Sequence, residues 1–127
     1  MEKIVVIGLG LIGGSLALSL KKKPDRIIVG LDNNAEHLNK ALELGIIDII
    51  GDFDEIKNAS VVIVAVPANA ITSVTKSVLD VVSDKTLVFD VGSVKKQVCH
   101  QIKNHPKRKN YVASHPIAGT EFSGPEA

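Results

Sequence analysis

The stretch that decides the fold lies near the N-terminus and reads Lys3-Ile4-Val5-Val6-Ile7-Gly8-Leu9-Gly10-Leu11-Ile12-Gly13. Its first five residues are rich in β-branched side chains and apolar on both faces, which is typical of a strand buried in the middle of a parallel sheet. The glycines then follow with the spacing G-x-G-x-x-G, and the next residues show helical periodicity. We therefore expect a strand, a tight glycine turn and a helix in succession.

The rest of the chain repeats this alternation of strand and helix. Further buried strands are expected at residues 26–31, 60–66 and 86–90, and shorter ones at 48–50 and 110–113. Segments with helical period lie between them, marked by these sets: Leu11, Ser15 and Leu18; Leu38, Ala41 and Leu42; Ile71, Val74, Val78 and Val82; Val94, Val98 and Ile102. This order predicts one α/β domain over residues 1–127, a doubly wound parallel sheet of the Rossmann type, with ligands at the carboxyl ends of the strands.

The glycine turn predicts a dinucleotide site. The glycines would allow a tight turn, close approach of a pyrophosphate and close packing of helix on strand, while the first helical amides would face the phosphates. The residues expected to bind are Gly8, Gly10, Leu11, Ile12 and Gly13. A glycine-rich turn without a ligand is the alternative, whereas a nucleoside triphosphate loop is excluded because Gly14 stands where its lysine is required.

An acidic residue at the end of the second expected strand indicates which dinucleotide would bind. Asp32 lies 32 − 13 = 19 residues beyond Gly13, where a carboxylate accepts hydrogen bonds from the adenosine ribose and repels a 2′-phosphate. NAD is therefore expected rather than NADP. Asn33 and Asn34 are candidates to cap the next helix. Val66 and Pro67 are expected beside the cofactor because their strand should adjoin the first, although a plain strand end is equally consistent.

Composition excludes several other classes of function. The formal net charge is +1, and the lysine and arginine residues are scattered apart from triplets at 21–23 and 107–109, which we interpret as solvated helix ends, so nucleic acid is not an expected partner. The single cysteine, Cys99, excludes an internal disulfide and a cysteine-rich zinc site, and no metal site is expected. No signal peptide or membrane-length apolar run is visible, which predicts a cytoplasmic protein without membrane contact.

Three stretches together resemble the prephenate dehydrogenase family. They are residues 8–17, GLGLIGGSLA; residues 90–95, DVGSVK; and residues 114–121, SHPIAGTE, which is the most specific of the three. The resemblance implies NAD-dependent oxidative decarboxylation of prephenate to 4-hydroxyphenylpyruvate, in the biosynthesis of tyrosine. The small-molecule substrate would then be prephenate.

The resemblance also implies which residues carry out the reaction. His115 matches the catalytic histidine, which accepts the proton of the ring hydroxyl, and Ser93 matches a serine that hydrogen-bonds the histidine and the substrate hydroxyl. Glu121 and Thr120 match loop positions beside the substrate. Alternatives from the residues alone are a loop histidine at 115, a helix N-cap at Ser93, and exposed loop residues at 120 and 121. His37, His100 and His105 are assigned no function.

Members of the family continue into a helical domain that forms a homodimer and supplies an arginine for the substrate carboxylate. On this resemblance, residues 1–127 hold the cofactor site and the catalytic histidine but only part of the substrate pocket, and the C-terminal dimerisation domain is absent from this chain. Two other functions remain open. One is an arogenate dehydrogenase, whose substrate differs only in the side-chain amino group, and the other is a non-catalytic NAD-sensing domain, which would need the glycine turn and Asp32 but not His115 and Ser93.

Overall fold

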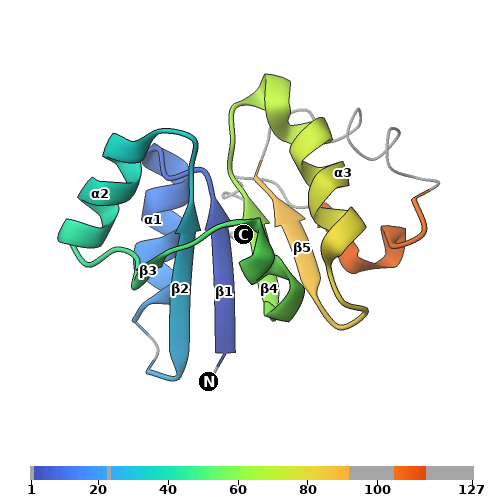
Figure 1. Cartoon of the computed structure of the whole chain (residues 1–127), viewed down its shortest axis with the longest axis horizontal. Coiled ribbons are helices and arrows are strands. Elements are labelled where there is room, and N and C mark those ends of the chain that lie inside the picture. The colour runs from blue at the N-terminus through green and yellow to red at the C-terminus, as the bar shows by residue number, and fades with distance from the viewer. Residues whose placement is uncertain (1, 23, 92–104, 114–127) are drawn as a thin grey trace, which may run out of the picture.

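The computed structural model describes residues 2–22, 24–91 and 105–113, and it shows a doubly wound α/β domain (Figure 1). Six parallel strands form one sheet in the order β3-β2-β1-β4-β5-β6. The strands are β1 (Glu2–Ile7), β2 (Arg26–Leu31), β3 (Ile49–Ile50), β4 (Val61–Val64), β5 (Leu87–Asp90) and β6 (Tyr111–Ala113). The α-helices are α1 (Leu11–Leu20), α2 (Ala35–Glu43) and α3 (Ile71–Val81), and short 3₁₀ helices lie at Phe53–Asn58, Ala68–Ala70 and Arg108–Asn110.

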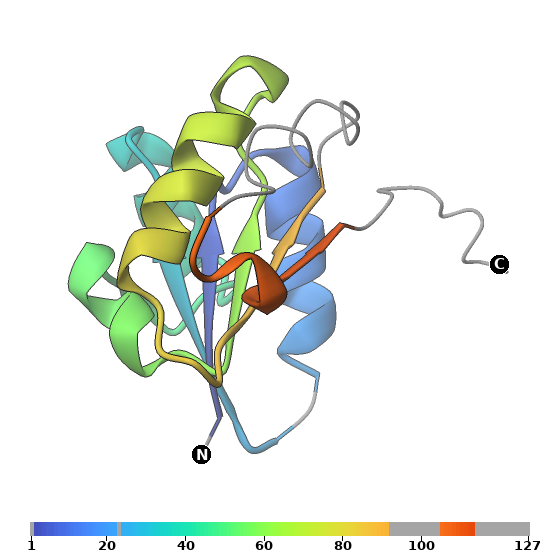
Figure 2. The ribbon, with the colours of Figure 1, turned by 90° about the vertical axis from the view of Figure 1, so that its right-hand side faces the viewer.

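The two faces of the sheet are covered by different helices. Alternate residues of β1 point to opposite sides: Ile4 and Val6 pack with Ala17 of α1 and Ala41 of α2, whereas Val5 and Ile7 belong to the cluster that contains α3. Figure 2 shows the sheet with α1 on one side and α3 on the other. The strand runs are apolar on both faces because both faces are buried, and the expected fold class is confirmed.

The order of the strands places the switch point of the sheet between β1 and β4. β1 pairs with β2 from Glu2↔Arg26 to Ile7↔Leu31 and with β4 from Ile4↔Val61 to Ile7↔Val64. The connections leave these two strands in opposite directions across the sheet, and in this class of fold ligands bind outside the carboxyl ends of such a pair of strands. β4 is shorter than predicted, since pairing stops at Val64 and the chain turns away through Ala65 to Pro67.

Helix positions are predicted well, but the buried faces of α1 and α2 are predicted less well. Ala17 and Ala41 are buried in the core, whereas Leu18 and Leu42 are 50% and 43% exposed. Asn34 is the N-cap of α2, as expected, and its side chain accepts hydrogen bonds from the amides of residues 36 and 37. The helix expected around Val94 lies outside the described residues.

The first residue of each basic triplet lies near the C-terminal end of an α-helix. Lys21 is the C-cap of α1 and pairs with Asp48 at 2.9 Å. Lys107 begins the second triplet in a turn, and its Nζ donates to the carbonyl of Val82, the C-cap of α3. Lys107 therefore compensates a carbonyl at the C-terminus of α3. In the described part of the chain, no helix has the length and apolar character needed to cross a membrane.

Two buried threonines give a matched test of the core. Thr86 Oγ1 donates to the Ala59 carbonyl at 2.8 Å, whereas the Thr75 hydroxyl on α3 has no hydrogen-bond partner among the described residues. An unpaired buried hydroxyl costs about 1–3 kcal/mol, so Thr75→Val should raise the free energy of unfolding by about 1 kcal/mol. Thr86→Val should lower it by about 1–2 kcal/mol because a carbonyl loses its donor. Urea unfolding measures both, and changes of the same sign would contradict this assignment.

Candidate nucleotide-binding site

The glycine turn after β1 requires glycine at two positions for different reasons. Gly8 has φ +96°, a conformation that side chains disfavour, and a Cβ there would lie 2.5 Å from the carbonyl oxygen of Ala65. A Cβ on Gly13 would lie 1.8 Å from the carbonyl oxygen of Gly8. Gly8 therefore lets the chain turn close to the segment after β4, and Gly13 lets α1 pack directly on the turn.

The remaining glycine of the turn, Gly10, leaves an open space at the start of α1. Gly10 is the N-cap of the helix, and nothing lies within 4 Å of the position that its Cβ would occupy. The amides of the first helical turn, which begins at Leu11 and Ile12, have no carbonyl partners within the helix and lie at the positive end of its dipole. Free amides beside an open space suit a phosphate group, whose approach a side chain at position 10 would obstruct.

The Asp32 side chain is hydrogen-bonded directly to this turn. Its Oδ2 accepts a hydrogen bond from the Leu9 amide at 2.7 Å, and its Oδ1 accepts one from the Asn34 amide at 2.9 Å. The side chain is only 9% exposed. Burial raises the pKa of Asp32, but hydrogen bonds from Leu9, Asn34 and His37 outweigh burial, so that the pKa is lowered from its ordinary value. The carboxylate is therefore ionised and fixed beside the glycine turn.

The segment after β4 lies on the opposite side of the turn. The Ala65 amide donates to the Ile7 carbonyl at 2.8 Å, and the amide nitrogen of Val66 would be 3.0 Å from a Cβ on Gly8. Val66 is half-buried and Pro67 is exposed. The predicted adjacency of this segment to the glycine turn is confirmed, while contact of Val66 and Pro67 with a cofactor remains a prediction.

The predicted catalytic residues Ser93, His115 and Glu121 lie outside the described residues. The strands that precede two of them are neighbours, since β5 and β6 are parallel and Asp90 pairs in register with Ala113. Both strands end at the same edge of the sheet as the glycine turn, which is where ligands bind in this class of fold.

A buried polar pair, which periodicity does not predict, joins those two strands. Tyr111 Oη donates a hydrogen bond to Asp90 Oδ2, and the two residues are 3% and 0% exposed. A buried carboxylate requires such a partner. The pair depends on the register of β5 and β6, which periodicity does not determine.

The contact of His37 with Asp32 is a second feature that the sequence did not predict. Its Nδ1 lies 3.1 Å from Asp32 Oδ2, the oxygen that also accepts from Leu9. The available signal was local: Asn34 begins α2, which places residue 37 in the first helical turn, close to the end of β2.

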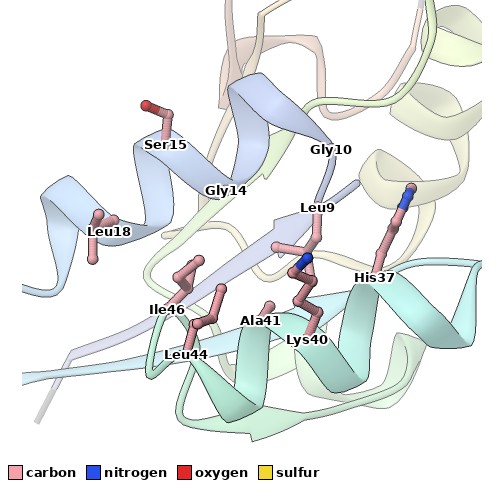
Figure 3. Close-up of a pocket in the computed structure, with 10 residues that line it drawn as sticks. All are labelled: Leu9, Gly10, Gly14, Ser15, Leu18, His37, Lys40, Ala41, Leu44 and Ile46. Carbon is pink, nitrogen blue, oxygen red and sulfur yellow. The ribbon is translucent and has the colours of Figure 1, made fainter.

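A cavity of about 300 Å³ lies between α1 and α2, on the helical face next to the glycine turn. Figure 3 shows Lys40, Ala41 and Leu44 facing α1 across it, with His37 at the same end as Gly10. Its other lining residues are Leu9, Gly14, Ser15, Leu18 and Ile46. Asp32 is not among them, although Leu9 and His37, which both contact its carboxylate, are.

Comparison with known proteins identifies the family to which this site belongs. The family described as prephenate dehydrogenase, nucleotide-binding domain, matches residues 16–127. The chain belongs to this family. It is 37% identical over 128 residues to a prephenate dehydrogenase of Bacillus subtilis, with 97% of this chain and 34% of that protein covered. The chain thus spans about a third of the length of that relative.

Solved structures of family members share the fold. The prephenate dehydrogenase of Aquifex aeolicus, in complex with hydroxyphenyl propionate and NAD⁺, superposes with a TM-score of 0.81 at 33% identity, covering 95% of this chain and 43% of that one. An arogenate dehydrogenase of Synechocystis gives a TM-score of 0.75 at 27% identity, covering 89% of this chain and 40% of that one. The family therefore includes oxidoreductases named for either substrate.

Proposed function

We propose that this chain is the NAD-binding domain of an enzyme that oxidatively decarboxylates prephenate to 4-hydroxyphenylpyruvate. The observation that carries the proposal is the ionised carboxylate of Asp32, held by the Leu9 amide at the mouth of the glycine turn. In a member of the prephenate dehydrogenase family, this arrangement supplies a site for the adenosine ribose next to a site for phosphate.

The described residues fit NAD. Gly10 and the amides at Leu11, Ile12 and Gly13 would hold the pyrophosphate, Asp32 would accept the ribose hydroxyls, and Val66 and Pro67 would lie beside the cofactor. When bound, NAD supplies a nicotinamide ring that accepts hydride. The protein itself orients the reactants and handles the proton.

His115, proposed as the catalytic base, would accept the proton of the ring hydroxyl as the hydroxyl-bearing carbon is oxidised and CO₂ is lost. An imidazole suits this step because its ordinary pKa of about 6.5 lies near working pH. Ser93 would hydrogen-bond His115 and the hydroxyl, and Glu121 would lie in the loop beside the substrate. These roles rest on the match of residues 90–95 and 114–121 to the family pattern and on the adjacent ends of β5 and β6.

Arogenate is the alternative substrate, because an arogenate dehydrogenase is among the solved structures that share this fold. Prephenate is favoured because the Bacillus and Aquifex relatives with that name are more similar to this chain, at 37% and 33% identity against 27%. The deciding experiment is NADH formation by the whole enzyme with each compound. A higher kcat/KM with arogenate would overturn the choice of substrate, and no turnover of either would favour a nucleotide sensor.

Asp32 gives a test of the cofactor that needs only this chain. Wild-type protein should bind NAD more tightly than NADP, and Asp32→Ala should weaken NAD binding about 10- to 100-fold, as expected when hydrogen bonds to a charged acceptor are lost. Asp32→Asn is the matched control for charge: it retains an oxygen for the Leu9 amide but should reduce the preference for NAD. Calorimetry with both nucleotides measures the affinities. An unchanged preference in both variants would remove Asp32 from the cofactor site.

A further inference from the structure

The Asp32 carboxylate is shared between backbone donors and one side chain. Oδ2 accepts from the Leu9 amide at 2.7 Å and lies 3.1 Å from His37 Nδ1, while Oδ1 accepts from the Asn34 amide at 2.9 Å. An ionised carboxylate only accepts hydrogen bonds, so the proton of this contact resides on Nδ1 of the imidazole. His37 thus donates a hydrogen bond to Asp32, the residue expected to bind the adenosine ribose.

The three donors nearly saturate this carboxylate. A carboxylate offers about four acceptor positions, and Leu9, Asn34 and His37 use three of them. The two amides are fixed by the glycine turn and by the start of α2, whereas His37 contributes a side chain that is 48% exposed and can change rotamer. Because a ribose brings two hydroxyl groups, His37 is the donor that must yield or share its position when a nucleotide binds.

We propose that His37 is a specificity-determining residue of the nucleotide site: its charge sets how strongly Asp32 rejects a 2′-phosphate. This inference rests on the proposed binding of NAD. With a neutral ring, the carboxylate keeps its full negative charge and excludes the phosphate of NADP. With a protonated ring, an imidazolium 3.1 Å away offsets that charge and attracts a phosphate.

Among the described residues of the elements next to His37, few other side chains carry a charge. Its own helix carries Glu36 beside it and Lys40 one turn away, and Lys40 also lines the cavity between α1 and α2. The part of α1 that lines this cavity contributes only glycine, serine and leucine, and the segment 65–70 after β4 has no ionisable side chain. Among these groups, an imidazole is the one whose charge ordinarily changes between about pH 5 and 8.

The test is the ratio of the dissociation constants of NADP and NAD, measured by calorimetry at about pH 8 and about pH 5.5. A free 2′-phosphate also gains a proton near pH 6, so His37→Gln provides the baseline, with the ligand titrating but position 37 neutral. We expect the preference for NAD to fall between the two pH values by about two- to fivefold more in wild type than in His37→Gln, the range for a partly exposed charge pair.

A second histidine–aspartate pair gives a matched control. His105 Nε2 lies 2.7 Å from Asp80 Oδ1 near the C-terminal end of α3, at the opposite edge of the sheet from the glycine turn. His105→Gln should therefore keep the wild-type pH dependence. Equal pH dependence in wild type and His37→Gln, with NAD still bound, would overturn the role of His37 alone. Absence of NAD binding in wild type at both pH values would instead overturn the proposed function on which it rests.

Discussion

Gly13→Ala should abolish most nucleotide binding, with a loss of affinity for NAD of at least about 100-fold. A methyl group at this position would sit 1.8 Å from the Gly8 carbonyl oxygen, so either α1 or the turn must move. Such a movement displaces the first amides of α1, and each hydrogen bond to a charged group contributes about 1.5–3 kcal/mol. The same overpacking should lower the free energy of unfolding by about 1–3 kcal/mol.

Substitutions at two neighbouring glycines distinguish the two possible causes of weak NAD binding, which are loss of the phosphate site and general loss of structure. Gly14 has only one atom, the Leu9 carbonyl oxygen at 3.9 Å, near its would-be Cβ, so Gly14→Ala should keep NAD binding and, as a better helix former, add about 1 kcal/mol of stability. Gly10 has open space around it, so Gly10→Ala should fold normally yet bind NAD poorly because the methyl group occupies the space for a phosphate. Urea unfolding and calorimetry on all three variants measure both properties. Normal NAD binding by Gly10→Ala and Gly13→Ala would show that the turn holds no pyrophosphate.

These glycines also show why the sequence predicts this part of the molecule well. A strand, a turn and a helix in direct succession are determined by neighbouring residues, so their spacing is visible in the chain itself. The alternation of strands and helices likewise implies the layers and the position of the switch point between β1 and β4. Leu9 and Asp32, 23 residues apart, are brought together by that topology, as the spacing predicts.

Other features depend on packing that the sequence does not display. Helix α1 is apolar nearly all round, so periodicity alone could not decide that Ala17 would be buried and Leu18 half exposed. The pairing of Tyr111 with Asp90 requires the register of two strands that are distant in sequence. The contact of His37 with Asp32 joins residues only five positions apart, so it is local in sequence. No characteristic spacing relates a histidine in a helix to a carboxylate before that helix, so the contact was not predicted.

His115 carries the prediction with the largest effect on catalysis. Under the proposed function it accepts the hydroxyl proton, a task distinct from holding the cofactor, which falls to the glycine turn and Asp32. A positioned acid–base group contributes about 10²–10⁴ in rate. Replacing it should therefore reduce turnover and leave nucleotide affinity almost unchanged.

The variant His115→Asn, measured in the whole enzyme with prephenate, should lower kcat by about 10²–10⁴ while the dissociation constant of NAD stays within about twofold. In wild type, kcat/KM should fall as the pH drops below the ordinary range of an imidazole pKa, because a protonated ring cannot accept the hydroxyl proton. That acid limb should be absent from the asparagine variant. Steady-state kinetics across pH and calorimetry with NAD test the three expectations together. A near-normal kcat with the wild-type pH profile would make His115 an ordinary loop residue and remove the proton-transfer step proposed for it.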